Sequence, residues 1–240
     1  MHKISIITIN YNNAIGLEKT ILSVLNQTIQ DFEFIVIDGK STDQSVDVIK
    51  QNQRINYWES EKDNGIYHAQ NKGAKKATGE YCLFLNSGDY LADATTLEKV
   101  AKELTKDIIY GDLLIEDAKG NRKNGVSSDR LDNYHFMIST LWHPCTFIKR
   151  SLFEQYGYYN ESFKITGDYE FFIRTILKNG ASYRHIPLPI TIFDTSGVSN
   201  NPDNKKLEHE ERRRSWLLNY SSVRLKLFEF KTKLKRRLNH

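Results

Sequence analysis

Short apolar runs alternate with amphipathic segments along the first 90 residues, and this alternation restricts the chain to a small set of folds. Runs at 3–9, 32–37, 55–58 and 81–85 have the composition and length of buried strands. The segments between them repeat apolar residues at helical spacing. Strand and helix patterns in this order predict a parallel sheet with helices on both faces. We therefore expect an α/β fold with a mostly parallel central sheet.

Polar residues follow each of these predicted strands. Asn10 and Asn12 come after the first strand, Asp38 after the second, and Asp63 in the loop after the third. The fourth strand ends at Asn86-Ser87-Gly88-Asp89. The carboxyl ends of parallel strands meet at one edge of a sheet, and ligands bind in the crevice at that edge. We therefore expect these polar residues to lie near a binding site.

Asp89 has two interpretations from these residues alone. A carboxylate at a strand end suits a divalent cation, which takes hard oxygen ligands and leaves positions open for phosphate oxygens. Asn-Ser-Gly-Asp is also typical of a tight turn, in which Asp89 caps the next helix. The local sequence leaves both alternatives open.

Two common nucleotide-binding motifs are missing from the sequence. The segment after the first strand, Asn10-Tyr11-Asn12-Asn13-Ala14, lacks the glycines of a dinucleotide-binding fingerprint. A phosphate-binding Gly-Lys-Ser/Thr loop does not occur either. The commonest nucleotide-binding solutions for an alternating α/β chain are therefore disfavoured.

The second half of the body has a different pattern, with short strands expected at 108–111, 113–115, 146–148 and 190–193. These mixed strands predict an acceptor-side half at 111–204, built onto a ligand-binding half at 1–110. Asp168 opens a helix, where the helix dipole favours an ionised carboxylate. It could serve as a general base or only cap the helix. His143 precedes Pro144 in an apolar stretch, a context in which structural histidines are common.

The tail at 205–240 differs sharply from the body in charge. It carries 12 Lys and Arg against 4 Asp and Glu, a net charge of +8, whereas the other 204 residues carry 22 and 26, a net charge of −4. This split argues against a nucleic-acid-binding core and predicts an acidic partner for the tail. An apolar stripe at helical spacing runs through Trp216, Tyr220, Val223, Leu227, Phe230, Leu234 and Leu238. The stripe predicts an amphipathic helix that packs on the body, pairs in a homodimer, or lies on an anionic membrane.

The sequence shows no signal peptide, and no apolar run approaches the ~20 residues that a membrane span needs. Cys82 and Cys145 lie in apolar contexts and are expected to be buried thiols in a reducing compartment. These features predict a cytoplasmic protein, with peripheral contact at the inner face of the membrane if the tail binds lipid.

The order of these motifs closely resembles that of the family-2 glycosyltransferases, inverting enzymes of the nucleotide-diphospho-sugar (GT-A) fold. The resemblance covers about residues 3–200. It rests on eight segments in the correct order, at 5–12, 22–28, 34–43, 63–73, 77–80, 84–89, 143–153 and 163–174. It implies a Rossmann-like sheet within a GT-A domain at 1–204, followed by the basic amphipathic helical tail at 205–240.

Several site residues follow from the resemblance, position by position. Asp168 matches the general base, and Asp89 matches the metal ligand for Mn²⁺ or Mg²⁺. The positions that the resemblance assigns to the donor, a UDP- or GDP-sugar, are Thr8, Asn10, Asn12, Asp38, Asp63, Asn71, Asn86, Ser87, Gly88, Asp89 and His143. For His143 the resemblance also raises a role on the acceptor side.

The sequence departs from the family pattern at two functional positions. Asp89 is the only carboxylate in its motif, so a metal is expected to bind together with the donor's diphosphate. The family's Glu-Asp pair is here Gly167-Asp168, and Glu170 is a rival for the role of base.

The resemblance implies transfer of a sugar to a glycan or lipid-linked acceptor in cell-surface polysaccharide synthesis, such as O-antigen, capsule or exopolysaccharide. Two alternatives remain, a nucleotidyltransferase on a related α/β sheet and a non-catalytic sugar-nucleotide-binding protein. A nucleotidyltransferase would need a Gly- and Arg/Lys-rich triphosphate loop after the first strand, and 10–14 is not such a loop.

Overall fold

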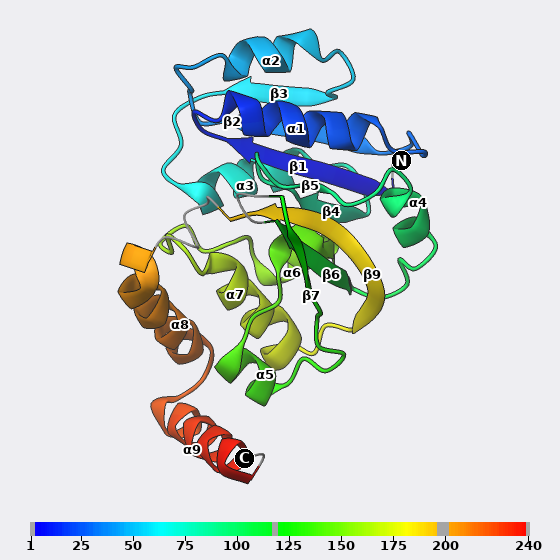
Figure 1. Cartoon of the computed structure of the whole chain (residues 1–240). Helices are drawn as coiled ribbons and strands as arrows, with labels where there is room; N and C mark the ends of the chain where they lie inside the picture. The colour runs from blue at the N-terminus through cyan, green and yellow to red at the C-terminus, as the bar shows by residue number, and fades with distance from the viewer. Residues whose placement is uncertain (1–2, 117–119, 196–201, 239–240) are drawn as a thin grey trace.

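The computed structural model describes residues 3–116, 120–195 and 202–238 (Figure 1). The strands are β1 (Ile4–Asn10), β2 (Glu33–Asp38), β3 (Tyr57–Ser60), β4 (Tyr81–Phe84), β5 (Tyr90–Leu91), β6 (Ile108–Glu116), β7 (Arg122–Gly125), β8 (Thr146–Lys149) and β9 (Tyr183–Asp194). The helices are α1 (Ala14–Leu25), α2 (Ser45–Gln51), α3 (Ile66–Lys76), α4 (Thr96–Ala101), α5 (Asn133–Ile138), α6 (Ser151–Tyr156), α7 (Gly167–Phe172), α8 (Lys205–Asn219) and α9 (Ser222–Leu238). Shorter helical segments are η1 (His143–Cys145), η2 (Ile173–Lys178), which continues α7, and η4 (Pro202–Asn204).

These strands form one curved sheet in the order β3-β2-β1-β4-β8-β6-β9-β5, with β7 paired to β6 (Figure 1). The first four strands are parallel, as the alternation predicted. From β8 onward the sheet is mixed, because β8 is antiparallel to both β4 and β6, whereas β9 is parallel to β6. The predicted α/β fold is confirmed, and the part in which every pair is parallel is formed by β1 to β4.

Helices cover both faces of the sheet, and each face has its own apolar core. Alternate residues of β1 and β2 point to opposite sides. Ile7 and Ile35 belong to the core under α3, α6 and α7, whereas Ile6 and Phe34 belong to the core under α1, α2 and α4. All seven residues of β1 are buried, as a continuous apolar run predicts. Cys82 and Cys145 are buried free thiols, as expected.

Several elements differ from the sequence predictions. β9 is far longer than the expected 190–193, because its prolines weaken the strand signal. The register shifts opposite Pro189 accommodate one of them. The two strands expected at 108–111 and 113–115 are a single strand, β6. Helix α2 begins without a side-chain cap. The N-cap is Gln44, and the Asp43 carboxylate accepts the backbone N–H groups of Ala14 and Ser45.

The tail is helical, as predicted, but it consists of two helices. The backbone of Tyr220 is extended and separates α8 from α9. α8 packs against α7, while α9 extends away from the sheet and contacts α5 (Figure 1). Among the described residues, no helix combines the length and apolar character that crossing a membrane requires.

Candidate active site

A cavity of about 470 Å³ opens at the carboxyl end of β4. Its walls come from the loop after β4, from α3 and η1, from the start of α7, from α8, and from parts of β6 and β9. The predicted site residues that line it are Asn86, Ser87, Asp89, His143 and Asp168. The fold thus brings the end of β4 together with two residues from much later in the sequence, at the edge where such sheets bind ligands.

Asp168 lies in the first turn of α7 with both carboxylate oxygens engaged. The Tyr67 hydroxyl is 3.0 Å from Oδ1, and His143 Nδ1 is 3.2 Å from Oδ2. The N-cap of α7 is Thr166, and Asp168 makes no side-chain cap there. The alternative that Asp168 only caps the helix is therefore wrong, because its carboxylate faces the cavity.

His143 connects Asp168 to the end of β4. Its Nε2 is 3.2 Å from Nδ2 of Asn86, and Oδ1 of Asn86 accepts a hydrogen bond from Gln70 Nε2 at 3.2 Å. An amide nitrogen only donates, so in this arrangement Nε2 accepts and the ring proton is on Nδ1, facing Asp168. Gln70, Asn86 and His143 thus form a hydrogen-bonded chain that orients the carboxylate.

Tyr67 supports Asp168 from α3. Its side chain is buried, and its hydroxyl is also 2.6 Å from the Ile165 carbonyl. Burial, and then the charge of Asp168, raise the pKa of Tyr67 well above its usual range, so the hydroxyl stays protonated and its one proton is shared between the Ile165 carbonyl and Oδ1 of Asp168. A Cβ at Gly167 would lie 2.8 Å from the Tyr67 ring. This packing explains why a glycine precedes Asp168, where the family pattern has a glutamate.

Asp89 lies beside the end of β9. Its Oδ1 accepts the Asp194 N–H at 2.9 Å, and a Cβ at Gly88 would lie 2.6 Å from Oδ2 of Asp194. Burial raises the pKa of Asp89 to about 7, and the Asp194 charge acts in the same direction. The predicted turn is also present, because the Asp89 N–H donates to the Asn86 carbonyl. Asp89 does not cap α4, whose N-cap is Thr95.

The pair of carboxylates at Asp89 and Asp194 fits a divalent cation. Asp89 is buried and Asp194 is half-buried, the charge of Asp194 disfavours the ionised form of Asp89, and a hard cation would relieve this repulsion. Within the described ranges, no cluster of three or more His, Cys, Asp or Glu side chains forms a complete metal site. The two carboxylates therefore fit a cation that takes its other ligands from phosphate oxygens and water.

A second polar cluster, at the ends of the first three strands, contains two of the residues predicted to bind the nucleotide-sugar donor. Asn10 and Asp38 are paired in register, and Nδ2 of Asn10 donates to Asp38 Oδ1 at 2.8 Å. The buried Asp38 carboxylate also accepts the hydroxyls of Ser41 and Ser60, at 2.5 and 2.6 Å. Asp38 therefore links the strand ends through hydrogen bonds. To bond to Asp38, a nucleobase N–H would have to displace one of the side chains that donate to it.

The other residues predicted to bind the donor do not line the 470 Å³ cavity. Asn12, which has a φ of 49°, accepts the Thr42 N–H through Oδ1. Asp63 packs beside Gly39 and pairs with Lys72 at 3.3 Å. Thr8 is fully buried in β1.

Asn71 is engaged in contacts within the fold. Its side chain is buried in α3 and bonds to both the N–H and the carbonyl of Tyr159, as well as to Glu161. Asn71 holds a loop of the second half against α3, so its amide is not available to a donor in this arrangement.

Helix α8 takes part in the site, although the sequence presents it as part of the basic tail. The buried Glu211 carboxylate accepts the backbone N–H groups of Lys164, Ile165 and Thr166, at 2.7, 2.9 and 2.9 Å. These residues immediately precede α7. Glu208 and Arg212, also on α8, line the cavity. The division of the chain at 204 stays a prediction, but α8 is packed into the structure that holds Asp168.

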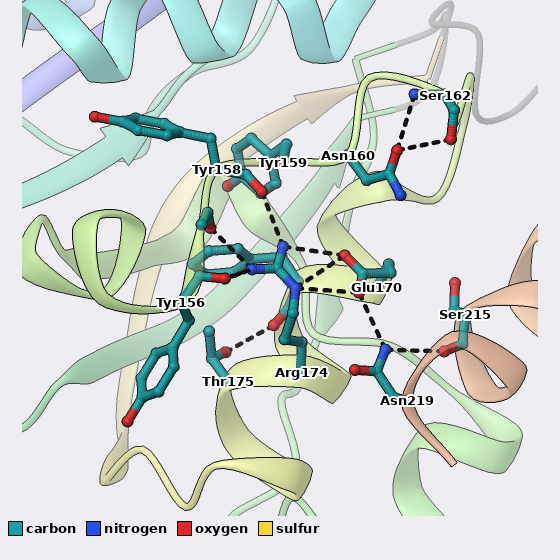
Figure 2. Close-up of polar contacts among 12 residues, drawn as sticks. Tyr156, Tyr158, Tyr159, Asn160, Ser162, Glu170, Arg174, Thr175, Ser215 and Asn219 are labelled. Atoms are coloured by element: carbon teal, nitrogen blue, oxygen red, sulfur yellow. Dashed lines mark hydrogen bonds and ion pairs between the residues drawn. The ribbon is translucent and has the colours of Figure 1, made fainter. Parts of the chain in front are cut away.

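Figure 2 shows a second link between α8 and α7. Glu170 is buried and pairs with Arg174, whose guanidinium also donates to the carbonyls of Tyr156, Gly157 and Tyr158. The Asn219 amide of α8 donates to Glu170 Oε1 at 3.0 Å. Glu170 is therefore committed to a structural cluster, which argues against it as the rival base. Arg174 lies one turn further along the chain and is its ion-pair partner.

Residues 5–160 match the family model for glycosyl transferase family 2. The chain therefore belongs to this family, as the motif order indicated.

Relatives and solved structures agree with this assignment. The chain is 29% identical over 206 residues to a PGL/p-HBAD biosynthesis glycosyltransferase of Mycobacterium bovis, with 82% of this chain and 78% of that protein covered. An uncharacterized glycosyltransferase of Mycobacterium tuberculosis is 30% identical over 209 residues, with 82% and 77% covered.

Two solved structures show the same fold at low sequence identity. S. aureus TarS 1–349 in complex with UDP-GlcNAc has a TM-score of 0.68 at 20% identity, over 83% of this chain and 61% of that one. The mannosyltransferase PcManGT from Pyrobaculum calidifontis, in complex with GDP-Man and Mn²⁺, has a TM-score of 0.63 at 16% identity, over 90% and 62%. The predicted GT-A fold is confirmed, and the chain spans about three fifths of the length of these two solved chains.

Proposed function

We propose that this chain is an inverting glycosyltransferase in which Asp168 is the general base. The position of its carboxylate on the cavity wall supports this role most strongly. Tyr67 and His143 fix its orientation, and each carboxylate oxygen keeps a lone pair for a further hydrogen bond. Family membership and the resemblance of 163–174 to the family motif support the same assignment.

The proposed reaction is a single displacement. Asp168 takes the proton of an acceptor hydroxyl while the hydroxyl oxygen attacks the anomeric carbon of the donor sugar. The bond from this carbon to the diphosphate oxygen breaks, and the nucleoside diphosphate leaves with the electron pair. Attack from the side opposite the leaving group inverts the configuration at the anomeric carbon.

We also propose that Asp89 and Asp194 hold Mn²⁺ or Mg²⁺ together with the donor's diphosphate. A bound cation would supply charge neutralisation for the departing diphosphate. The burial of Asp89 and the nearby charge of Asp194 support this assignment. A structural neighbour was solved with GDP-Man and Mn²⁺, which agrees with it.

The donor we propose is a UDP- or GDP-sugar, with its nucleoside near the cluster of Asn10 and Asp38. The neighbours solved with UDP-GlcNAc and with GDP-Man support this class of donor. We further propose a glycan or lipid-linked acceptor and a role in cell-surface polysaccharide synthesis on the cytoplasmic side of the membrane. The relative named for PGL/p-HBAD biosynthesis supports a biosynthetic role.

Metal and donor are expected to bind together. In a thermal-shift panel of UDP- and GDP-sugars, the correct donor with Mn²⁺ should raise Tm more than the sum of the separate shifts. At a donor concentration about 100 times Kd, the gain is about 2.7 kcal/mol, or roughly 5–10 °C. Asp89→Asn should abolish this synergy, whereas Asp93→Asn, at an exposed carboxylate, should keep it. Synergy that persists in Asp89→Asn would contradict the metal assignment.

Tyr67→Phe is expected to lower kcat about tenfold and to change the donor KM by less than about twofold. The substitution removes one hydrogen bond to the carboxylate, and a factor of ten corresponds to about 1.4 kcal/mol. Steady-state kinetics with the donor found in the panel would measure both constants. Tyr156→Phe, outside the cavity, is the matched control. An unchanged kcat in Tyr67→Phe would show that Tyr67 does not position Asp168.

A further inference from the structure

Helix α9 has two apolar faces on opposite sides. Leu225 is buried, and Phe228 packs against Trp216 and Tyr220. The outward side chains are Val223, Leu227, Phe230 and Leu234, which are 76%, 47%, 65% and 49% exposed. The predicted apolar stripe is thus divided. Trp216 and Tyr220 hold α9 to the body through Phe228. Within the part of the chain that the structure describes, the outward residues of α9 are not covered by other elements.

The four outward residues, which we call the outer stripe, occupy a narrow band of the helix. Successive residues are about 100° apart around a helix, so positions 223, 227, 230 and 234 fall within about 60° of one another. By the same geometry, Lys226, Lys233 and Arg237 flank the band on one side, and Arg224, Lys231 and Lys235 flank it on the other. The Lys235 ammonium lies over the ring of Tyr134, and the Arg224 guanidinium lies over the ring of Tyr220.

We infer that the outer stripe of α9 lies on an anionic lipid surface. An apolar band bordered on both sides by Lys and Arg matches the boundary between acyl chains and anionic headgroups. The bulky Phe230 and the leucines would enter the acyl region, while the long basic side chains reach back to the headgroups. The outer stripe points away from the residues that attach α9 to the body, so the helix can bind lipid without detaching.

The charge of α9 favours lipid over a second copy of the chain. The helix carries seven Lys and Arg and a single acid, Glu229. In a symmetric dimer, the same patch would face itself and would bring these basic flanks together. Like charges placed opposite each other at an interface oppose association. A nucleic acid would satisfy the charges but would leave the central apolar band without a partner.

Lipid binding would hold the cavity near the membrane. α9 follows directly on α8, which lines the cavity with Glu208 and Arg212 and spans about 22 Å. An acceptor carried by a membrane lipid would then be within reach of the site. The lipid surface itself is inferred from α9 alone, so it does not depend on the proposed reaction.

Co-sedimentation of the full chain with vesicles tests this inference. Vesicles of phosphatidylcholine mixed with phosphatidylglycerol are expected to bind the chain at least about tenfold more tightly than phosphatidylcholine alone, and less tightly at high salt. Phe230→Asp combined with Leu234→Asp should reduce binding at least about tenfold. Val126→Asp, at another exposed apolar residue outside α9, should not reduce it.

A second pair of variants separates charge from folding. Lys226→Glu with Lys233→Glu should weaken binding to the anionic vesicles, whereas Lys50→Glu on α2 should not. Circular dichroism should give every variant the Tm of the unchanged chain. Failure of the unchanged chain to bind anionic vesicles would overturn the inference, as would equal binding by the Phe230 and Leu234 variant. A dimer in light scattering that this variant dissociates, without vesicle binding, would assign the outer stripe to a second copy instead.

Discussion

Asp168→Asn is expected to lower kcat by at least about 10³-fold while the donor Kd stays within about twofold. The amide keeps the size of the side chain but cannot take a proton from the acceptor hydroxyl, and general-base catalysis contributes about 10²–10⁴-fold. Donor affinity should persist because the substitution leaves the carboxylates at Asp89 and Asp194 unchanged. Single-turnover transfer with a saturating donor would measure the chemical step, and calorimetry would measure donor binding.

Two comparisons make the result specific to Asp168. Asp129→Asn, whose parent side chain is 93% exposed, should behave like the unchanged protein. Glu170→Gln should lower stability, because it disturbs the buried pair with Arg174 and the Asn219 contact. If Asp168→Asn retained transfer while a folded Glu170→Gln lost it, Glu170 would be the base.

After Asp168→Asn, Glu211→Gln is expected to be the most damaging of the proposed substitutions, although Glu211 is distant from β4 in the sequence. Its carboxylate accepts three backbone N–H groups just before α7. The glutamine amide has one acceptor oxygen, and its NH₂ group would face N–H donors. A buried hydrogen bond to a charged group contributes about 1.5–3 kcal/mol, so unfolding should occur about 5–10 °C lower.

The same substitution should also reduce turnover. Asp168 lies two residues beyond the last N–H group that Glu211 holds, so a looser segment would leave the carboxylate less well placed. At temperatures below Tm, we expect kcat to be lower than that of the unchanged protein by about 10-fold or more, with the donor Kd little changed. Glu210→Gln, on the exposed side of α8, is the matched control. A Glu211→Gln protein with unchanged Tm and kcat would show that α8 does not support the site.

Local patterns were sufficient to predict the first half of the fold. β1, β2, β4 and the helices between them follow from apolar periodicity, because these strands are buried on both faces and each helix has a buried stripe, whereas β3 lies at the edge of the sheet and is partly exposed. The polar residues at the strand ends could also be located, since topology alone brings parallel carboxyl ends together. This is why Asp89 and Asn10 were found at the expected edge.

The remaining site residues depend on contacts between distant parts of the chain. Asp194 joins Asp89 across 105 residues, and β9 carries prolines that hide it as a strand. Tyr67 and Gln70 look like ordinary helix residues until α3 is placed beside α7. Glu211 lies within a run of charges that the sequence assigns to the basic tail. In each case the role comes from burial and partners, which local sequence does not encode.

The stereochemistry of transfer tests the proposed function most directly. With the donor selected by the thermal panel and a simple acceptor, proton NMR at early times would give the anomeric configuration of the first product. A single displacement assisted by Asp168 predicts a configuration opposite to that of the donor sugar, and no such product from Asp168→Asn. A product that retains the donor's configuration would contradict the account, because it would require a second displacement that this site is not proposed to make.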